Sequence, residues 1–417
     1  MITTESEAVA DPLPDLSKWI RPGDSIVWGQ AGGEPEALTR ALVAQRAALG
    51  PLTVTVGFSL TDTISPEHAD HIRIRSYCAS GTNRSLSRAG LLDILPVPYS
   101  WLPNALADID VLMLHLPPAR PDGRFNLGLM QEYIAPLIPR ARVILAEVND
   151  QMPSVPGLLD IGPEQIDHIV ETSRPLRELH HPAPGAAELK IARHIAGIIE
   201  DGSVLQMGLG QIPEAVLSAL GQHRDLGIHS GVIGDGVADL TEAGVITNAR
   251  KTRDQGVSVT GWLLGSRRIY DFAHGNDGVR LCPCTYTHNP AILAEHDRYV
   301  AINAAIEVDL TGQVNAEVAG GRYIGAVGGA AEFLRGAHAS RGGLPIIALP
   351  STVARTGASR IVAQLSGPVS TPRSEAGLIV TEHGIADLRG RSLRERRKLM
   401  IDIAGPEHRA ALEAAET

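Results

Sequence analysis

The feature that most restricts the fold of this chain is a pattern that occurs once in each half. Residues 23–42 (GDSIVWGQAGGEPEALTRAL) read as a turn, a short apolar strand, a glycine-rich loop and a helix. Pro35 falls where the first turn of that helix begins, a position that suits its fixed φ. Residues 202–220 (GSVLQMGLGQIPEAVLSAL) can be laid over this stretch, with Pro213 at the place of Pro35. Either match alone is a common α/β pattern.

A second correspondence follows in the same order along the chain. Residues 111–126 match residues 300–315, which brings Gly123 onto Gly312 and Asn126 onto Asn315. Two matches in one order predict two tandem copies of one α/β unit. We expect an N-terminal arm at residues 1–18, an N-terminal domain at residues 19–182 and a C-terminal domain at residues 187–417, with the boundary in a Pro-rich stretch (HHPAPGA, 180–186).

Short apolar runs indicate how each copy is built. Residues 52–57, 111–116 and 142–148 are β-rich, and helical patterns lie around residues 36–48 and 127–138. Buried parallel strands joined by crossover helices explain continuous apolar runs better than alternating antiparallel strands do. The predicted fold class is α/β, with two related open sheets. The cleft between them is the expected place for a small-molecule site.

Charge and cysteine content narrow the function classes. The formal net charge of −10 argues against a nucleic-acid-binding surface. Three cysteines fit a reducing compartment, and Cys282 and Cys284 are too close for a zinc pair. The histidines are not spaced as metal ligands (His115, His288 and His383 among them), and no metal is expected. The acidic N-terminus is no signal peptide and no apolar run is long enough to span a membrane, so a cytoplasmic protein is predicted.

Four glycine loops are the candidate binding elements, at residues 29–33, 208–210, 231–236 and 325–329. None has the glycine spacing of a Rossmann fingerprint or a P-loop, which weakens the hypothesis of an enzyme that binds a nicotinamide cofactor or a nucleotide. A loop that joins a strand to a helix can still offer backbone N–H groups to an anion or to a thioester oxygen. For any single loop, a simple reversal of chain direction explains the glycines about as well as a binding role does.

Several longer motifs resemble the acetyl-CoA hydrolase/transferase family. They come in family order from about residue 200 to the C-terminus, and the N-terminal half matches more loosely through residues 33–35, 121–128 and 147–149. The pattern is most similar to that of class I CoA-transferases that use butyryl- or 4-hydroxybutyryl-CoA and acetate. The C-terminal motifs are LQMGLGQIP (205–213), LGIHS (226–230), DGVADL (235–240), GVITN (244–248), LGS (264–266), YDF (270–272), INAAIEVDLTGQVNAE (302–317), VGGAAEFLRGA (327–337), IALPST (347–352) and VTEHGIADLRG (380–390).

The resemblance implies a mechanism that this sequence does not match at its central residue. In the family a glutamate follows His-Ser, attacks the acyl-CoA thioester and goes on to form an enzyme–CoA thioester. Here Gly231 stands at that position, so the nucleophile is absent and space beside the thioester is expected to be vacant. Ala330 and Glu332 also stand where the family commonly has Gln and Asp.

The other matched positions keep the roles that the resemblance implies. Asn315 would hydrogen-bond CoA near the thioester, and Gly328 and Gly329 would supply backbone N–H groups for the thioester oxygen. The stretch Gly208–Gln211, with Gly210, and Asn248 would complete the pocket. CoA itself would be a substrate, and no tightly bound cofactor is expected.

Other residues are candidates to replace the missing carboxylate. Glu147 and Glu34 follow strands of the first half and are candidate general bases for water, although a helix cap or an interdomain hydrogen bond explains them somewhat better. His229 is a candidate to orient water or a structural histidine, and Asp235 reads as a cap or turn residue. The basic pairs Arg250-Lys251 and Arg267-Arg268 are candidates to meet the CoA phosphates, with surface charge the alternative.

The function that we predict is processing of an acyl-CoA at its thioester, by CoA transfer to a small carboxylic acid or by hydrolytic release of CoA. The alternatives are a catalytically silent CoA-binding protein and a hydrolase of carbon–carbon bonds in a ring-containing acyl-CoA. The family habit implies a homodimer or homotetramer, and neither nucleic acid nor membrane is an expected partner.

Overall fold

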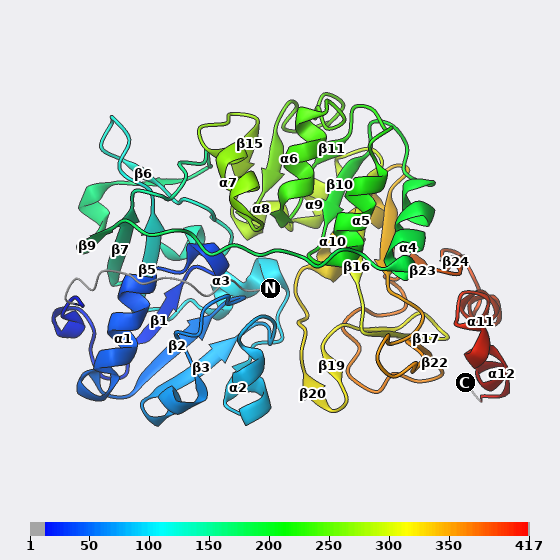
Figure 1. Cartoon of the computed structure of the whole chain (residues 1–417), viewed down its shortest axis with the longest axis horizontal. Coiled ribbons are helices and arrows are strands. Elements are labelled where there is room, and N and C mark those ends of the chain that lie inside the picture. Colours follow the sequence, from blue (N-terminus) through cyan, green and yellow to red (C-terminus); the bar gives the residue numbers. More distant parts are fainter. Residues whose placement is uncertain (1–12, 416–417) are drawn as a thin grey trace. The chain divides into compact units, whose positions relative to one another are not determined.

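The computed structural model describes residues 13–415, which divide into two compact units (Figure 1). The first runs to His180 and also contains Thr260–Tyr286; the second comprises His181–Val259 and the chain from Thr287 onward. Residues 260–286 had been assigned to the C-terminal domain from the sequence. They pack with the first unit because they form backbone bridges with it: Met130 with Trp262, Glu132 with Pro283 and Gly157 with Leu281.

The sheet of the first unit has seven strands in the order β4-β3-β2-β1-β5-β7-β9, and every neighbouring pair is parallel. All six residues of β5 are buried, which explains why this strand reads as a continuous apolar run. The strands are β1 Ser25–Trp28, β2 Leu52–Val56, β3 Ile72–Ser76, β4 Leu92–Ile94, β5 Val111–Leu116, β7 Val143–Asn149 and β9 His168–Thr172.

Helix α1 (Glu36–Leu49) covers this sheet. Its buried residues Leu38, Ala41 and Leu42 recur at helical spacing and pack into the core beneath, and it ends where Gly50 takes a φ of 88°. The other regular elements that lie within this unit are α2 Arg84–Ala89, α3 Leu102–Ala105, β6 Phe125–Asn126, β8 Asp160–Ile161, β14 Trp262–Leu263, α7 Arg267–Ala273 and β15 Val279–Leu281.

The helix predicted over residues 127–138 is wrong. Only a 3₁₀ turn forms there, at Ala135–Leu137. The stretch is buried on nearly every side rather than on one face, so its apolar content does not report a helical period. Gly128 has a φ of 62°, and Pro136 removes a helical donor.

The sheet of the second unit has six strands in the order β11-β10-β16-β21-β23-β24, all parallel except the final antiparallel pair. The strands are β10 Val204–Met207, β11 Gly227–Ile228, β16 Tyr299–Ala304, β21 Leu344–Ala348, β23 Leu378–Thr381 and β24 Gly384–Asp387. Smaller strands are β12 Val232–Ile233, β13 Ser258–Thr260, β17 Glu307–Asp309, β18 Val314–Asn315, β19 Val318–Ala319, β20 Arg322–Tyr323 and β22 Ile361–Val362.

Helices flank the strands of this sheet in sequence. Helix α10 packs on β16 and β21, where Phe333 and Leu334 join a core with Tyr299 and Ile347, and α4 packs against α5. The helices are α4 Ala186–Ala196, α5 Gln211–Ala219, α6 Asp235–Glu242, α9 Pro290–Ala294, α10 Ala330–Ala339, α11 Leu393–Asp402 and α12 Arg409–Ala414. The short helix α8 (Cys284–Thr287) belongs to the first unit up to Tyr286.

The two units repeat one plan, as the sequence predicted. In the first, β1 pairs with β5 through Ile26 and Val111; in the second, β10 pairs with β16 through Leu205 and Val300. Each first strand leads through a glycine loop into a helix, α1 or α5. The α/β fold class with two related open sheets is therefore confirmed.

Of the predicted N-terminal arm, residues 1–12 lie outside the described residues. Leu16–Lys18 forms a 3₁₀ turn, and Leu16 is fully buried in the core of the first unit. No helix in the described part of the chain has the length and apolar character needed to span a membrane.

Candidate functional site

The loop that carries Gly231 is held firmly at the end of β11. The Ser230 hydroxyl lies within hydrogen-bond distance of the carbonyl oxygens of Val232 (2.8 Å) and Met207 (3.1 Å), and it accepts from the Met207 N–H (3.2 Å), which ties the loop to the end of β10. The Tyr299 hydroxyl donates to the carbonyl oxygen of His229 at 3.0 Å. His229 Nδ1 lies 3.1 Å from His296 Nε2 inside the unit, so this histidine is part of a buried pair.

Gly231 does not leave an empty space, which corrects the expectation from the sequence. A Cβ placed on Gly231 would lie 2.9 Å from His288 Cε1, 3.0 Å from His288 Nε2 and 3.3 Å from Phe333 Cζ. Contacts that close are tighter than van der Waals packing allows. The volume beside Gly231 is therefore filled by an imidazole and a phenyl ring.

Local sequence and helix packing bring His288 to this position. The Asn289 side chain accepts a hydrogen bond from the Ala291 N–H and Pro290 is the first helical residue, so α9 begins directly after His288. Helix α9 packs on α10, where Gly336 allows the close approach of Leu293. The His288 ring then lies against Phe333, with ring centroids 4.4 Å apart.

The loop before α10 lies on the other side of the same imidazole. A Cβ on Gly329 would lie 2.5 Å from His288 Nε2, so this position also requires glycine. Gly328 has a left-handed φ of 58°. Within residues 13–415, the backbone N–H groups of Val327, Gly328 and Gly329 donate to no acceptor. Three unused donors at the start of a ten-residue helix suit a negatively charged oxygen.

The histidine that lies between these two loops is uncharged. Burial lowers the pKa of His288 to about 3, so its imidazole is uncharged at physiological pH. Its Nδ1 lies 2.9 Å from the Thr287 hydroxyl. Asp235 is the first residue of α6 and follows the N-cap Gly234, so a role as the cap of this helix stays a prediction.

Asn315 is fully buried and uses all its hydrogen-bonding capacity within its own loop. Its Nδ2 donates to Glu307 Oε1 (2.9 Å) and to the Val318 carbonyl (2.7 Å), while its Oδ1 accepts from the N–H groups of Glu317 and Val318 at 3.0 Å each. This arrangement shapes the turn after β18. A direct contact from Asn315 to CoA stays a prediction.

The remaining pocket candidates of the second unit fall into two groups. Gly208 and Gly210 are half-buried at the end of β10, and a Cβ on either would meet no atom closer than 3.7 Å. Asn248 and Lys251 are instead buried supports of β11. The Asn248 side chain accepts from the Ile228 N–H (2.8 Å), and Lys251 Nζ donates to the Ile228 carbonyl (2.8 Å), so Lys251 is not a surface charge for a CoA phosphate.

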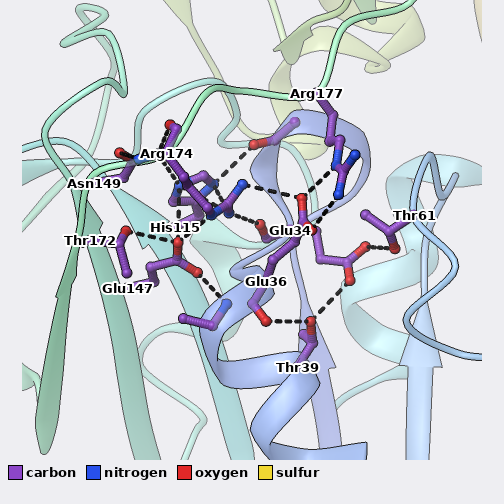
Figure 2. A network of polar contacts seen from close by, with 12 residues as sticks. Glu34, Glu36, Thr39, Thr61, His115, Glu147, Asn149, Thr172, Arg174 and Arg177 are labelled. Atoms are coloured by element: carbon purple, nitrogen blue, oxygen red, sulfur yellow. Dashed lines mark hydrogen bonds and ion pairs between the residues drawn. The ribbon is translucent and has the colours of Figure 1, made fainter. Parts of the chain in front are cut away.

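Glu147 lies in the first unit and is the centre of a paired network (Figure 2). Its carboxylate accepts from Arg174 Nε (2.6 Å), the Ala37 N–H (2.8 Å) and the Thr172 hydroxyl (2.9 Å). Burial raises the pKa of Glu147, but His115 and Arg174 outweigh it and lower the pKa below its ordinary value. Glu147 is thus held as a paired carboxylate.

Glu34 lies in the same network with different partners. It accepts from the hydroxyls of Thr61 (2.7 Å) and Thr39 (3.0 Å), and burial followed by the nearby Glu36 charge raises its pKa. Glu36 itself takes two bonds of 2.7 Å from Arg177. Burial opposes ionisation of Glu36, but the hydrogen bond from Arg177 and the charge of Arg174 lower its pKa to about 2. The catalytic role of Glu34 or Glu147 stays a prediction.

Two chemically notable residues were not assigned a site role from the sequence: His288 and Glu132. Glu132 is fully buried, accepts from Gln30 Nε2 (2.5 Å) and from the Tyr99 hydroxyl, and burial raises its pKa to about 8. The only sequence signal for it is that Gln30 belongs to the flagged loop at residues 29–33. No group of three metal-ligating side chains occurs among the residues that the structure describes.

Comparison with known proteins gives the same family for both halves of the chain. The acetyl-CoA hydrolase/transferase N-terminal domain matches residues 13–175, and the acetyl-CoA hydrolase/transferase C-terminal domain matches residues 265–416. The 4-hydroxybutyrate coenzyme A transferase of Clostridium kluyveri is 37% identical over 93% of this chain and 92% of its own length. The succinyl-CoA:cyclohexane-1-carboxylate CoA transferase of Geobacter metallireducens is 34% identical over 98% of this chain and 95% of its own.

Solved structures agree with this assignment. RipA from Yersinia pestis superposes with a TM-score of 0.91 at 34% identity, over 95% of this chain and 94% of that one. The 4-hydroxybutyrate CoA-transferase from Porphyromonas gingivalis gives a TM-score of 0.81 at 33% identity, with the same coverage of both chains.

Proposed function

Because this chain belongs to the acetyl-CoA hydrolase/transferase family, and is an acyl-CoA-processing enzyme of the transferase or hydrolase class, we propose that it releases CoA by hydrolysis of an acyl-CoA thioester. The observation that carries this proposal is the surroundings of Gly231. Gly231 itself carries no carboxylate, and His288 and Phe333 fill the volume that a side chain would enter. An enzyme–CoA thioester at position 231 is therefore not part of the proposed route.

The proposed reaction begins with water attacking the thioester carbonyl carbon. The carbonyl oxygen gains negative charge, the carbon–sulfur bond then breaks, and CoA leaves as the thiolate while the acyl group leaves as the carboxylic acid. The unused N–H groups of Val327, Gly328 and Gly329 would bind the charged oxygen. One such donor typically contributes about 10²–10³ in kcat.

A general base would take the proton from water, and we propose Glu34 for this role ahead of Glu147. A base for neutral pH needs a pKa near 7, and burial moves Glu34 in that direction, whereas pairing with Arg174 moves Glu147 away from it. We expect Glu34→Gln to lower kcat by about 10²-fold or more. Glu147→Gln is the matched control, since it removes a buried carboxylate from the same network. Equal kcat in both variants would exclude Glu34 as the base.

Transfer of CoA to a carboxylic acid is the second candidate. Relatives above 30% identity include proteins named as CoA transferases, among them butyryl-CoA:acetate and succinyl-CoA:acetate enzymes. Here the acceptor carboxylate would attack the bound thioester directly in place of water. Acetate and succinate are the acceptors that these names suggest. A homodimer or homotetramer in the cytoplasm stays a prediction, with light scattering as the test of assembly.

The deciding experiment measures free thiol from acetyl-, butyryl-, succinyl- and cyclohexane-1-carboxyl-CoA, with and without acetate or succinate, in ¹⁸O-labelled water. Thiol release without acceptor, with one ¹⁸O in the acid, is the expected result. Release of no thiol, together with formation of a new acyl-CoA only when acceptor is present, would replace hydrolysis by transfer. Binding of CoA with no reaction under any condition would identify a silent CoA-binding protein.

A further inference from the structure

We infer that Gln30 is a positioning residue for the reaction, whose buried side chain fixes the turn at residues 31–33 and thereby the place of Glu34, the base proposed above. The inference rests on the proposed function, since Glu34 is a base only within it. Gln30 needs no contact with substrate for this role, because it acts through the backbone of the turn that follows it.

The side-chain amide of Gln30 uses all four of its hydrogen-bonding positions inside the first unit. Its Nε2 donates to Glu132 Oε1 (2.5 Å) and to the Tyr99 hydroxyl (2.9 Å). Its Oε1 accepts from the Phe58 N–H (2.8 Å) and from the Tyr77 hydroxyl (2.7 Å). The residue is only 2% exposed. Any rotation of the amide would leave buried polar groups unpaired, so the side chain has one stable orientation.

The turn that follows Gln30 is strained and is held in place from outside. Ala31 has a φ of 47°, in the left-handed region that a residue with a Cβ rarely adopts. Its N–H donates to the Phe58 carbonyl at 2.8 Å, and Phe58 is also the residue whose N–H binds the Gln30 side chain. A strained backbone persists only while its surroundings enforce it. Gln30 and Phe58 together therefore keep this turn from relaxing.

The turn places Glu34 between two threonine hydroxyls. Glu34 directly follows the turn, and its N–H donates to the Ala31 carbonyl at 3.2 Å. Its carboxylate accepts from Thr61 (2.7 Å) and Thr39 (3.0 Å), as Figure 2 shows. Thr61 lies three residues after Phe58, so the two loops that Gln30 ties together carry the carboxylate and one of its partners. A shift of the turn would change both the place and the burial of the carboxylate.

The surroundings of Glu34 give this positioning a signature in the pH profile. Burial first and the charge of Glu36 second raise the pKa of Glu34. The cations nearby are turned elsewhere: Arg174 donates to the Glu34 carbonyl at 2.9 Å, and Arg177 binds Glu36. Burial also keeps the hydroxyl of Tyr133 uncharged by raising its pKa. A looser turn would admit water and lower the pKa of Glu34, and because a base acts when deprotonated, the acid limb of kcat would move to lower pH.

The test compares Gln30→Met, which keeps the length of the side chain and removes its polar atoms, with Asp24→Leu. Asp24 is buried at the opposite end of β1, where it accepts from the Arg21 N–H and from Arg142 at 2.7 Å each. We expect Gln30→Met to lower kcat by about 10²-fold with KM changed by only a few fold, and to move the acid limb between pH 4 and 8 to lower pH. Asp24→Leu should keep kcat within a few fold and leave the profile in place. Equal kcat and equal profiles in the two variants would overturn the inference.

A second pair of variants tests the same link from the side of Glu132. Glu132→Gln keeps an acceptor for Gln30 Nε2, whereas Glu132→Leu removes it. We expect kcat to be about tenfold or more higher in Glu132→Gln than in Glu132→Leu, and only the Leu variant to move the acid limb. This pair decides the question if thermal melting shows that Gln30→Met does not fold. Equal kcat in the two Glu132 variants would contradict the inference.

Glu34→Gln separates failure of the inference from failure of the proposed function. Wild-type kcat in Gln30→Met beside an impaired Glu34→Gln would refute the positioning role alone. Wild-type kcat in Glu34→Gln would refute the proposed base and the positioning role with it. A wild type that cleaves no thioester would refute the proposed function itself.

Discussion

The ends of the parallel strands are filled in opposite ways in the two units. In the first unit they carry two carboxylates, Glu36 and Glu147, that pair with the two arginines Arg174 and Arg177 (Figure 2). In the second, the glycine loop that follows β11 lies against the neutral ring of His288, which comes just before α9. The same strand–loop–helix plan therefore holds a buried network of ion pairs in the first unit and an uncharged, closely packed histidine in the second.

Electrostatics gives this difference a functional meaning. A buried charge is tolerated only when it is paired. The network of the first unit therefore has a structural role, which is to hold its loops and β9 together. A neutral site keeps its donors for charge that appears during reaction. Mutation of the paired charges in the first unit should therefore act mainly on stability. Mutation in the second region, or at Glu34, whose carboxylate contacts threonines and no arginine, should act mainly on catalysis.

The largest effect should come from breaking the ionic network at Arg174. Arg174→Met leaves Glu147 and Glu36 without a cation that each contacts directly, at 2.6 and 3.2 Å. Removing one partner of a buried ion pair costs about 3–5 kcal/mol, to be measured by denaturant unfolding. Arg73→Met is the matched control, because the exposed pair of Arg73 with Asp93 should contribute less than about 1 kcal/mol. Similar losses in both variants would contradict the contrast between the regions.

A middle effect is expected when a carboxylate is returned to position 231. Gly231→Glu should destabilise the protein by about 1–3 kcal/mol, because the new side chain meets His288 and Phe333. The double variant Gly231→Glu/His288→Ala should recover stability and form a covalent enzyme–CoA adduct with acyl-CoA, detectable by mass spectrometry. If the single variant is as stable as the wild type and forms the adduct without the second substitution, His288 does not restrict the space at position 231.

The smallest effect, when stability is compared across a single pH unit, is expected at Glu132, an acid of the first unit that lies outside the ionic network. The pKa of Glu132 is raised from 4.5 to about 8, so between these values the folded state holds the extra proton. The free energy of unfolding should then fall as pH rises through this window, by at most about 1.4 kcal/mol per pH unit. The contribution is fully present below pH 4.5. Glu132→Gln should flatten this slope, and an unchanged slope in urea titrations from pH 5 to 8 would assign it to other groups.

The fold was predictable from the sequence where burial of an element produces a local pattern of apolar residues. The strands β5 and β7 are apolar along their length, and the paired glycine loops mark both copies of the plan. The predicted helix at residues 127–138 failed because that stretch is buried all round, so its apolar residues carry no period. The return of residues 260–286 to the first unit depends on long-range backbone bridges that leave no such trace.

The site was predictable only in part, for the same reason. The resemblance identified Gly231 and the loop with Gly328 and Gly329, which are local motifs. It did not identify His288, because that side chain reaches Gly231 only through the packing of α9 on α10. Nor did the sequence reveal that Glu147 pairs with Arg174, which lies two residues after the end of β9.

The binding of Arg177 to Glu36 has a consequence for limited proteolysis. The chain that leaves β9 contains two arginines, and since proline follows Arg174, only the bond after Arg177 is a trypsin site. The Arg177 guanidinium is held by Glu36, its carbonyl accepts from the Tyr270 hydroxyl at 2.9 Å, and the Leu179 N–H donates to the Gly265 carbonyl at 2.9 Å. A protease needs this side chain free and the backbone extended. Cleavage there would therefore report opening of the first unit, although the segment reads as an ordinary proline-rich linker.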